Sequence, residues 1–226
     1  MPAIDRFIDS LGSVGPRRVA FGLAVVSSSM LVLRDRRLLP VPLFIQYVLL
    51  SLLIAPQLYA PIAFVRLGLG LAVCLVLYVT AGHVQRDTPA QPSPRDPVPG
   101  TTARPAMVPN LRATGTVFRL LVLALGGVAA YGLWRTHPFP LMPSELSLAA
   151  YWLMSIGMLV ALTSAEPLLT GFGLLTFMNG FEGMYLCLER SLLVVSLLNM
   201  VDLSIALGIV VCSEAWLESL RVEDTK

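Results

Sequence analysis

Residues 168–188 read LLTGFGLLTFMNGFEGMYLCL, and residues 191–213 read SLLVVSLLNMVDLSIALGIVVCS. Only Glu189 and Arg190 separate these two apolar runs. A helix of about 20 residues crosses a hydrocarbon core about 30 Å thick, and both runs reach that length. The pair therefore predicts a transmembrane helical hairpin.

The hairpin contains two carboxylates, Glu182 and Asp202, in otherwise apolar sequence. At a rise of about 1.5 Å per residue, Glu182 lies roughly 10 Å and Asp202 roughly 18 Å from the turn. Both are thus expected near the middle of the hydrocarbon core. A carboxylate at that depth is costly unless it is paired, protonated or hydrated, so it marks a candidate functional site. Two of them at similar depth indicate a place where protons could be held.

The composition of the chain is typical of a polytopic membrane protein. Of its 226 residues, 56% are hydrophobic and 13% are charged, whereas about a quarter of a soluble domain is charged. Further apolar runs predict five more spans, at residues 18–33, 41–56, 61–82, 115–134 and 146–165. We therefore expect an all-α polytopic membrane protein with about seven transmembrane helices.

A proline-rich segment divides the chain. Seven prolines fall within residues 83–114 among Thr, Ser, Arg and Asp, a composition typical of a flexible linker outside the membrane. We expect an N-terminal three-span region at residues 1–82 and a C-terminal four-span bundle at residues 115–213. An acidic, amphipathic tail at residues 214–226 is expected to leave the membrane along its surface.

Arginine and lysine predict the orientation. Apart from Arg66 and Arg119 inside spans, nine of these residues lie in the loops after spans one, three and five and in the C-terminal tail, and five lie on the opposite side. Because cytoplasmic loops carry the excess of positive charge, we expect the N-terminus outside and the C-terminus in the cytoplasm.

The chain lacks the sequence motifs of a stand-alone enzyme, such as a phosphate-binding glycine loop or a nucleophile elbow. Cys74, Cys187 and Cys212 stand singly in predicted spans, without metal-ligand or redox spacing. We therefore expect no cofactor and no metal in this chain. The arginines are spread over the loops rather than gathered in a patch, so nucleic acid is not expected as a partner.

Polar residues inside the predicted spans follow a pattern. Asn179 and Glu182 are three residues apart on one face of a helix, and Asn199 and Asp202 repeat that spacing on the next helix. The two faces could oppose each other and share hydrogen bonds. Arg66, about one turn into its span, either extends to the membrane surface or balances a buried acid.

Two interpretations of these polar groups remain open. They either hold helices together or dock a neighbouring subunit, as interhelical polar contacts often do, or they form a proton relay, because desolvation favours the protonated form of a carboxyl group. The first helix of the hairpin also contains four glycines, whose lack of a side chain permits close packing with a partner; these are Gly171, Gly173, Gly180 and Gly183.

The hairpin resembles a known family. GFGLLTFMNG at residues 171–180 is similar to the Phe-Gly and Met-Glu-Asn-Gly stretch of hydrogenase 4 component E, a family akin to the K subunit of complex I and the C subunit of Mrp antiporters. VDLSIAL at residues 201–207 resembles the acidic residue and apolar run of that family's last span. Weaker similarities surround Gln46 and Arg66. The family's glutamate before Asn-Gly is Met178 here, and Glu182, one turn further on, is the candidate to take over its role.

The resemblance implies a C-terminal bundle like the K subunit, in a complex I-like or group 4 hydrogenase-like respiratory complex of the inner membrane. Antiporter-like subunits would be its neighbours, and flavin, iron–sulfur clusters and metals would belong to other chains. The chain would contribute to proton or sodium translocation, with relay candidates Glu182, Asp202 and Arg66 and polar helix-packing residues Asn179, Asn199 and Gln46.

Two alternatives remain. The chain could be a structural scaffold subunit without a proton-relay role, or an independent small membrane transporter. A small transporter predicts internal repeats, and residues 18–82 and 115–213 show no convincing repeat at the level of sequence.

Overall fold

The computed structural model describes residues 15–33, 37–55, 60–87, 116–139, 142–189 and 191–224. These residues form helices and no strand, which confirms the all-α expectation for this part of the chain. Each helix covers one of the predicted apolar runs. The helices are α2 (Pro16–Val32), α3 (Pro40–Ile54), α4 (Ala60–Asp87), α5 (Thr116–Thr136), α6 (Ser144–Thr163), α7 (Pro167–Leu188) and α8 (Leu192–Asp224).

Prolines mark where several helices begin. Pro16, Pro40 and Pro167 are the first residues of α2, α3 and α7. Proline suits this position because the first N–H groups of a helix have no partner within the helix, and its fixed φ angle matches helical geometry. The prolines therefore set the starts of helices that follow short connections.

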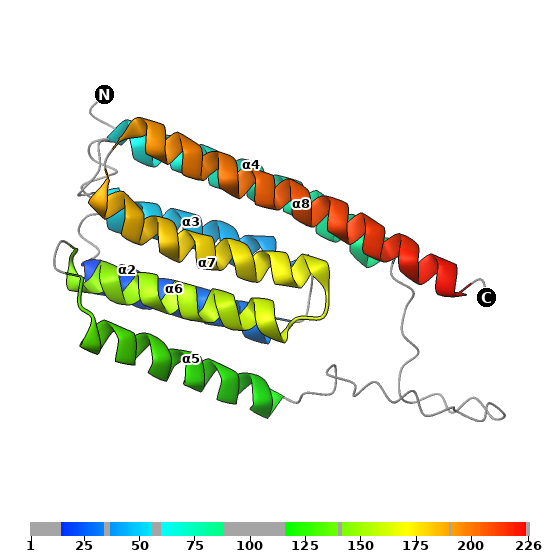
Figure 1. The fold of residues 1–226 in the computed structure, drawn as a ribbon, viewed down its shortest axis with the longest axis horizontal. Helices are drawn as coiled ribbons and strands as arrows, with labels where there is room; N and C mark the ends of the chain where they lie inside the picture. The colour runs from blue at the N-terminus through cyan, green and yellow to red at the C-terminus, as the bar shows by residue number, and fades with distance from the viewer. Residues whose placement is uncertain are drawn as a thin grey trace.

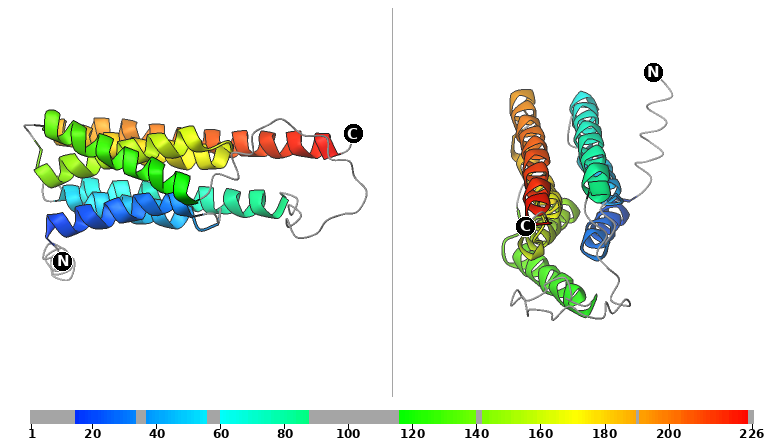
Figure 2. Two further views of the ribbon diagram at one scale, coloured as in Figure 1. Left: turned by 90° about the horizontal axis from the view of Figure 1, so that it is seen from below. Right: turned by 90° about the vertical axis from the view of Figure 1, so that its right-hand side faces the viewer.

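The helices form two packed layers (Figures 1 and 2). One layer holds α2, α3 and α4, and the other holds α5 to α8. α2 packs on α6, α3 on α7 and α4 on α8, while α5 lies against α6 and α2 at one edge. α4 and α8 run in the same direction (Figure 1). The trios α2–α3–α4 and α6–α7–α8 thus have the same order and the same direction.

Four helices contain segments long and apolar enough to cross a membrane: Val65–Arg86, Phe118–Thr136, Ser144–Thr163 and Leu192–Ser219. Pro40–Ile54 is a shorter apolar helix. Large apolar side chains also cover the outside of the bundle; for example, Phe21 is 71% exposed and Leu193 is 74% exposed. Soluble monomers rarely show apolar surface on this scale. The described part of the chain therefore has the character of a helical membrane protein.

α4 and α8 extend further than the sequence predicted. α4 continues to Asp87, five residues into the expected linker, whose remainder lies outside the described residues. α8 continues without a break through residue 214 to Asp224, so the acidic residues 214–224 belong to the same helix as the last predicted span. Leu217 is buried in the same apolar cluster as Ala81 and Val84 of α4. This contact explains why the two helices stay paired. At about 1.5 Å per residue, α8 is roughly 50 Å long, more than a hydrocarbon core requires.

Glycines allow α7 to pack closely on three sides. A Cβ atom on Gly173 or Gly180 would approach the backbone of α6 to within 3.0 Å, and Gly157 of α6 likewise faces the backbone of α7. Gly171 faces a side chain of α8, and Gly183 faces a side chain of α3. The prediction of close packing is confirmed, and the partners are helices of the same chain.

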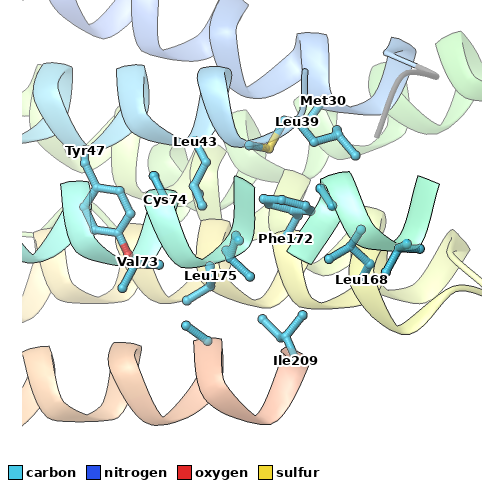
Figure 3. Packing of buried hydrophobic residues seen from close by; sticks show 14 of the residues in the cluster. Met30, Leu39, Leu43, Tyr47, Val73, Cys74, Leu168, Phe172, Leu175 and Ile209 are labelled. Carbon is cyan, nitrogen blue, oxygen red and sulfur yellow. The ribbon is translucent and has the colours of Figure 1, made fainter. Parts of the chain in front are cut away.

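Buried apolar side chains fill the space between the layers. The largest cluster lies among α3, α4, α7 and α8 and includes Val73, Phe172 and Leu175 (Figure 3). Tyr47 reaches from α3 into this cluster. A second cluster, with Leu50 and others, lies closer to the ends of α3 and α7, and a third joins α2, α5 and α6. A polar site lies at the boundary of the first two clusters.

Candidate functional site

Three charged side chains are buried among the described residues, and they meet in one place. Arg66 of α4 is 3% exposed, Glu182 of α7 is 1% exposed and Asp202 of α8 is fully buried. Charged side chains are rarely buried unless they are paired. Together with Asn179 and Tyr47, they form what we call the acid–arginine cluster.

Arg66 binds two residues of α7. Its Nη2 atom lies 2.9 Å from Oε2 of Glu182 and donates a hydrogen bond to Oδ1 of Asn179 at 3.0 Å. Both partners therefore lie on one face of α7, as their spacing predicts. The side chain of Arg66 is directed into the bundle, so of the two interpretations left open, extension to the membrane surface is wrong and balance of a buried acid is correct.

Tyr47 connects the fourth helix to the cluster. Its hydroxyl donates a 2.7 Å hydrogen bond to Oδ2 of Asp202, and the carboxyl groups of Asp202 and Glu182 lie within hydrogen-bonding reach of each other. The Tyr47 ring packs against Gly70 of α4, where a Cβ atom would lie 2.7 Å from Cγ of the ring. Gly70 therefore makes the space that lets Tyr47 reach Asp202.

The members of the cluster lie at similar depth. Tyr47 is seven residues before the end of α3, Arg66 is six residues after the start of α4, and Glu182 is six residues before the end of α7. Asp202 is ten residues after the start of α8. These helix ends lie at the same end of the bundle (Figure 1). All four residues are thus roughly 9–15 Å from that end, at a rise of about 1.5 Å per residue.

Apolar layers separate the cluster from both ends of the bundle. Towards the end where α8 finishes lie Val73, Leu175 and Ala206, and towards the other end lie Leu50, Leu186 and Val195, all less than 9% exposed. In such surroundings the effective dielectric constant is low, so each unpaired charge is costly and each paired one interacts strongly. The cluster is therefore an electrostatically isolated unit.

Several polar atoms of the cluster are incompletely satisfied. Two donors, Nε of Arg66 and Nδ2 of Asn179, and two acceptors, Oε1 of Glu182 and Oδ1 of Asp202, have no hydrogen-bond partner among the described residues. Most buried polar atoms in native proteins are paired, so each unpaired one needs an explanation. Each of these four atoms could form a further hydrogen bond.

The two remaining polar candidates lie at different places. Asn199 is 8% exposed and lies one turn before Asp202, but the hydrogen bonds found among the described residues do not join it to the cluster. Gln46 is fully buried, and its Nε2 atom donates to Sδ of Met30 at 3.6 Å. The same sulfur accepts a 3.4 Å hydrogen bond from Thr176. Gln46 therefore contacts α2 rather than the acids, and the Met30 sulfur connects it to α7.

Metal chemistry has few candidate ligands here. Cys74 and Cys212 are free thiols, and within the described ranges no three His, Cys, Asp or Glu side chains gather as a metal-binding group.

Sequence reasoning missed Tyr47 and Gly70. Tyr47 stands in an apolar run, where a tyrosine is usually read as a packing or interfacial residue. The available signal was spacing: Gly70 follows Arg66 by four residues on one face of α4, which marks a place where another side chain can approach the arginine.

Comparisons with protein-family models, with curated proteins and with solved structures give no match to this chain.

Proposed function

We propose that this chain is an integral membrane subunit of a complex I-like or group 4 hydrogenase-like respiratory complex, and that its buried carboxylates contribute to proton or sodium translocation. The observation that supports the proposal most is the acid–arginine cluster. Its two carboxyl groups and one guanidinium, from three helices, lie inside an apolar bundle. Ionisable groups at membrane depth are expensive and typically mark ion or proton pathways.

The charge of the cluster favours a role in moving protons over a role in packing alone. A helix contact needs one acid for one arginine, and a second acid adds only the cost of burying another charge. Here Asp202 adds that second acid, and it contacts Tyr47 and Glu182 rather than a second cation. A surplus carboxyl group beside an ion pair is suited to taking up and releasing a proton.

The finer architecture belongs to the same proposal. We infer that all seven helices span the cytoplasmic membrane, with the N-terminus outside and the C-terminus in the cytoplasm, and that α6–α8 correspond to a K-subunit-like bundle. The resemblance of residues 171–180 and 201–207 to hydrogenase 4 component E supports this inference. In that orientation, the cluster lies in the outer half of the membrane and the paired ends of α4 and α8 project into the cytoplasm.

Co-purification tests membership in such a complex. The full chain, tagged at its own locus, is extracted from native membranes with a mild detergent, captured, and its companions are identified by mass spectrometry. Antiporter-like subunits together with an iron–sulfur protein are the expected companions. Repeated recovery of the chain alone, or only with copies of itself, would contradict the proposal.

One observation favours an independent transporter as a second candidate. The trios α2–α3–α4 and α6–α7–α8 repeat the same order and direction, and the cluster lies between them. Transporters often bind their ions between structural repeats. Purified chain in liposomes with a trapped pH-sensitive dye separates the two candidates. An independent transporter acidifies the lumen when a sodium or potassium gradient is applied, whereas a subunit that works only within its complex does not.

A further inference from the structure

We propose that Glu182 and Asp202 share a single exchangeable proton, held between Oε1 of Glu182 and Oδ1 of Asp202, and that Arg66 and Tyr47 are positioning residues that keep it there. This inference rests on the proposed function only in one respect, namely what the shared proton is used for. The protonation state itself is argued from the contacts of the cluster.

The four carboxyl oxygens of Glu182 and Asp202 differ in their hydrogen bonds. Oε2 of Glu182 faces Arg66 at 2.9 Å, and Oδ2 of Asp202 accepts from Tyr47 at 2.7 Å. The other oxygen of each acid has no donor among the described residues, yet the two carboxyl groups lie within hydrogen-bonding reach of each other. Two carboxylates cannot bond to one another without a proton. One proton between them gives both remaining oxygens a partner at once.

A shared proton also balances the charge of the acid–arginine cluster. With both acids ionised, Arg66 leaves one negative charge uncompensated; with both protonated, Arg66 is itself unpaired. One shared proton makes the cluster neutral, which is the cheapest state for an apolar interior. The ionisable groups that contribute to the electrostatics of the two acids are Tyr47 on α3, Arg66 on α4 and the acids on α7 and α8. α6, which also packs on α7, carries a single charged residue, Glu145, in its first turn.

The same contacts disfavour a metal cation at this position. Hard cations bind about six oxygen ligands, whereas two carboxyl oxygens are left without a partner here. The Tyr47 hydroxyl donates to Asp202 rather than presenting a free oxygen. The Arg66 guanidinium, in contact with Glu182, would also repel an incoming cation. A proton meets none of these obstacles.

Infrared spectroscopy tests the inference directly. A protonated carboxyl group shows a C=O stretch where carboxylates do not absorb, and that band moves when its proton is exchanged for deuterium. We expect one such band from the full chain in lipid at neutral pH. Glu182→Gln and Asp202→Asn should each abolish it, because the acid that remains then pairs with Arg66 and ionises. Arg66→Met should raise its intensity about twofold, because both acids then need a proton.

Conservative variants keep the test decisive if an acid variant folds poorly. Tyr47→Phe removes the donor to Oδ2 of Asp202, so the band should persist and move to higher frequency. Glu189→Gln and Glu214→Gln replace exposed acids of the same helices or their ends and should leave the band unchanged. The inference is overturned by absence of the band from the native chain, by its full survival in either buried-acid variant, or by its loss when sodium chloride replaces potassium chloride.

The outcome is independent of the proposed function. A shared proton can be present in a chain that belongs to no respiratory complex, and companions found by co-purification say nothing about the infrared band. Failure of one claim can therefore be told from failure of the other.

Discussion

Removing Arg66 should destabilise the bundle more than removing Arg66 and Glu182 together. Arg66→Met deletes the only buried cation of the described residues, which contacts Glu182 at 2.9 Å and Asn179 at 3.0 Å. Side-chain exposure of 4% for the arginine and 1% for the glutamate means that water does not screen the pair. Breaking a buried ion pair by removing one partner typically costs about 3–5 kcal/mol. We expect a loss of that size in the free energy of unfolding.

The double variant Arg66→Met, Glu182→Met tests whether the two residues contribute to the free energy of unfolding as a pair. It leaves one buried acid, Asp202 with its Tyr47 partner, instead of two buried acids without a cation, so its stability should exceed that of Arg66→Met. The assay is unfolding of the purified full chain in mixed micelles by titration with dodecyl sulfate, followed by circular dichroism. The loss in Arg66→Met should shrink at acid pH, because two acids that lack a cation must both be protonated in the folded chain, and proton uptake costs less as the pH falls.

Arg135 provides the matched control, because it is an exposed arginine near the end of α5. Arg135→Met should change the free energy of unfolding by less than about 0.5 kcal/mol. Equal stability of Arg66→Met and the native chain, or strictly additive losses in the double variant, would refute the reasoning.

Two further predictions concern glycines. Gly70→Ala places a Cβ atom 2.7 Å from Cγ of Tyr47, so we expect a loss of about 1–3 kcal/mol in the free energy of unfolding. Gly68→Ala is its control: a Cβ atom there meets nothing within 4 Å, so this change should be neutral or slightly stabilising. Gly157→Ala drives a methyl group against the backbone of α7, which cannot move aside like a side chain, so its thermal unfolding midpoint should fall further than that of Gly70→Ala. Gly208→Ala, in open space, is the control; equal midpoints for the variants and their controls would show that the helices are not packed this closely.

The positions of the helices could be predicted from the sequence because a segment in lipid must satisfy its backbone groups within itself. Long apolar runs therefore predict helices almost directly. Their arrangement could not be predicted in this way, since lipid and the bundle interior both favour apolar side chains. Leu193 is 74% exposed and Leu50 is fully buried, and neither the residue type nor its neighbours distinguishes them. The packing of the end of α8 could not be predicted either, because Leu217 is buried only where α8 lies against Ala81 and Val84 of α4.

The charged members of the site could be predicted for a related reason. Arg66, Glu182 and Asp202 stand out in apolar runs, and the spacing of Asn179 and Glu182 predicts their shared face. Which arginine atom meets which acid depends on how α4 packs against α7 and α8, and helix spacing within one segment does not contain that information.

The most direct measurement of the central claim is ion pumping by the assembled complex that carries Glu182→Gln with Asp202→Asn. Inverted membrane vesicles energised by the complex's own electron donor report pumping through a pH-sensitive dye. The matched control carries Glu189→Gln with Glu214→Gln, two exposed acids. The account predicts that the buried double variant assembles and transfers electrons but loses pumping, while the control pumps normally. Unchanged pumping by an assembled complex with the buried double variant would contradict it and leave the chain a scaffold.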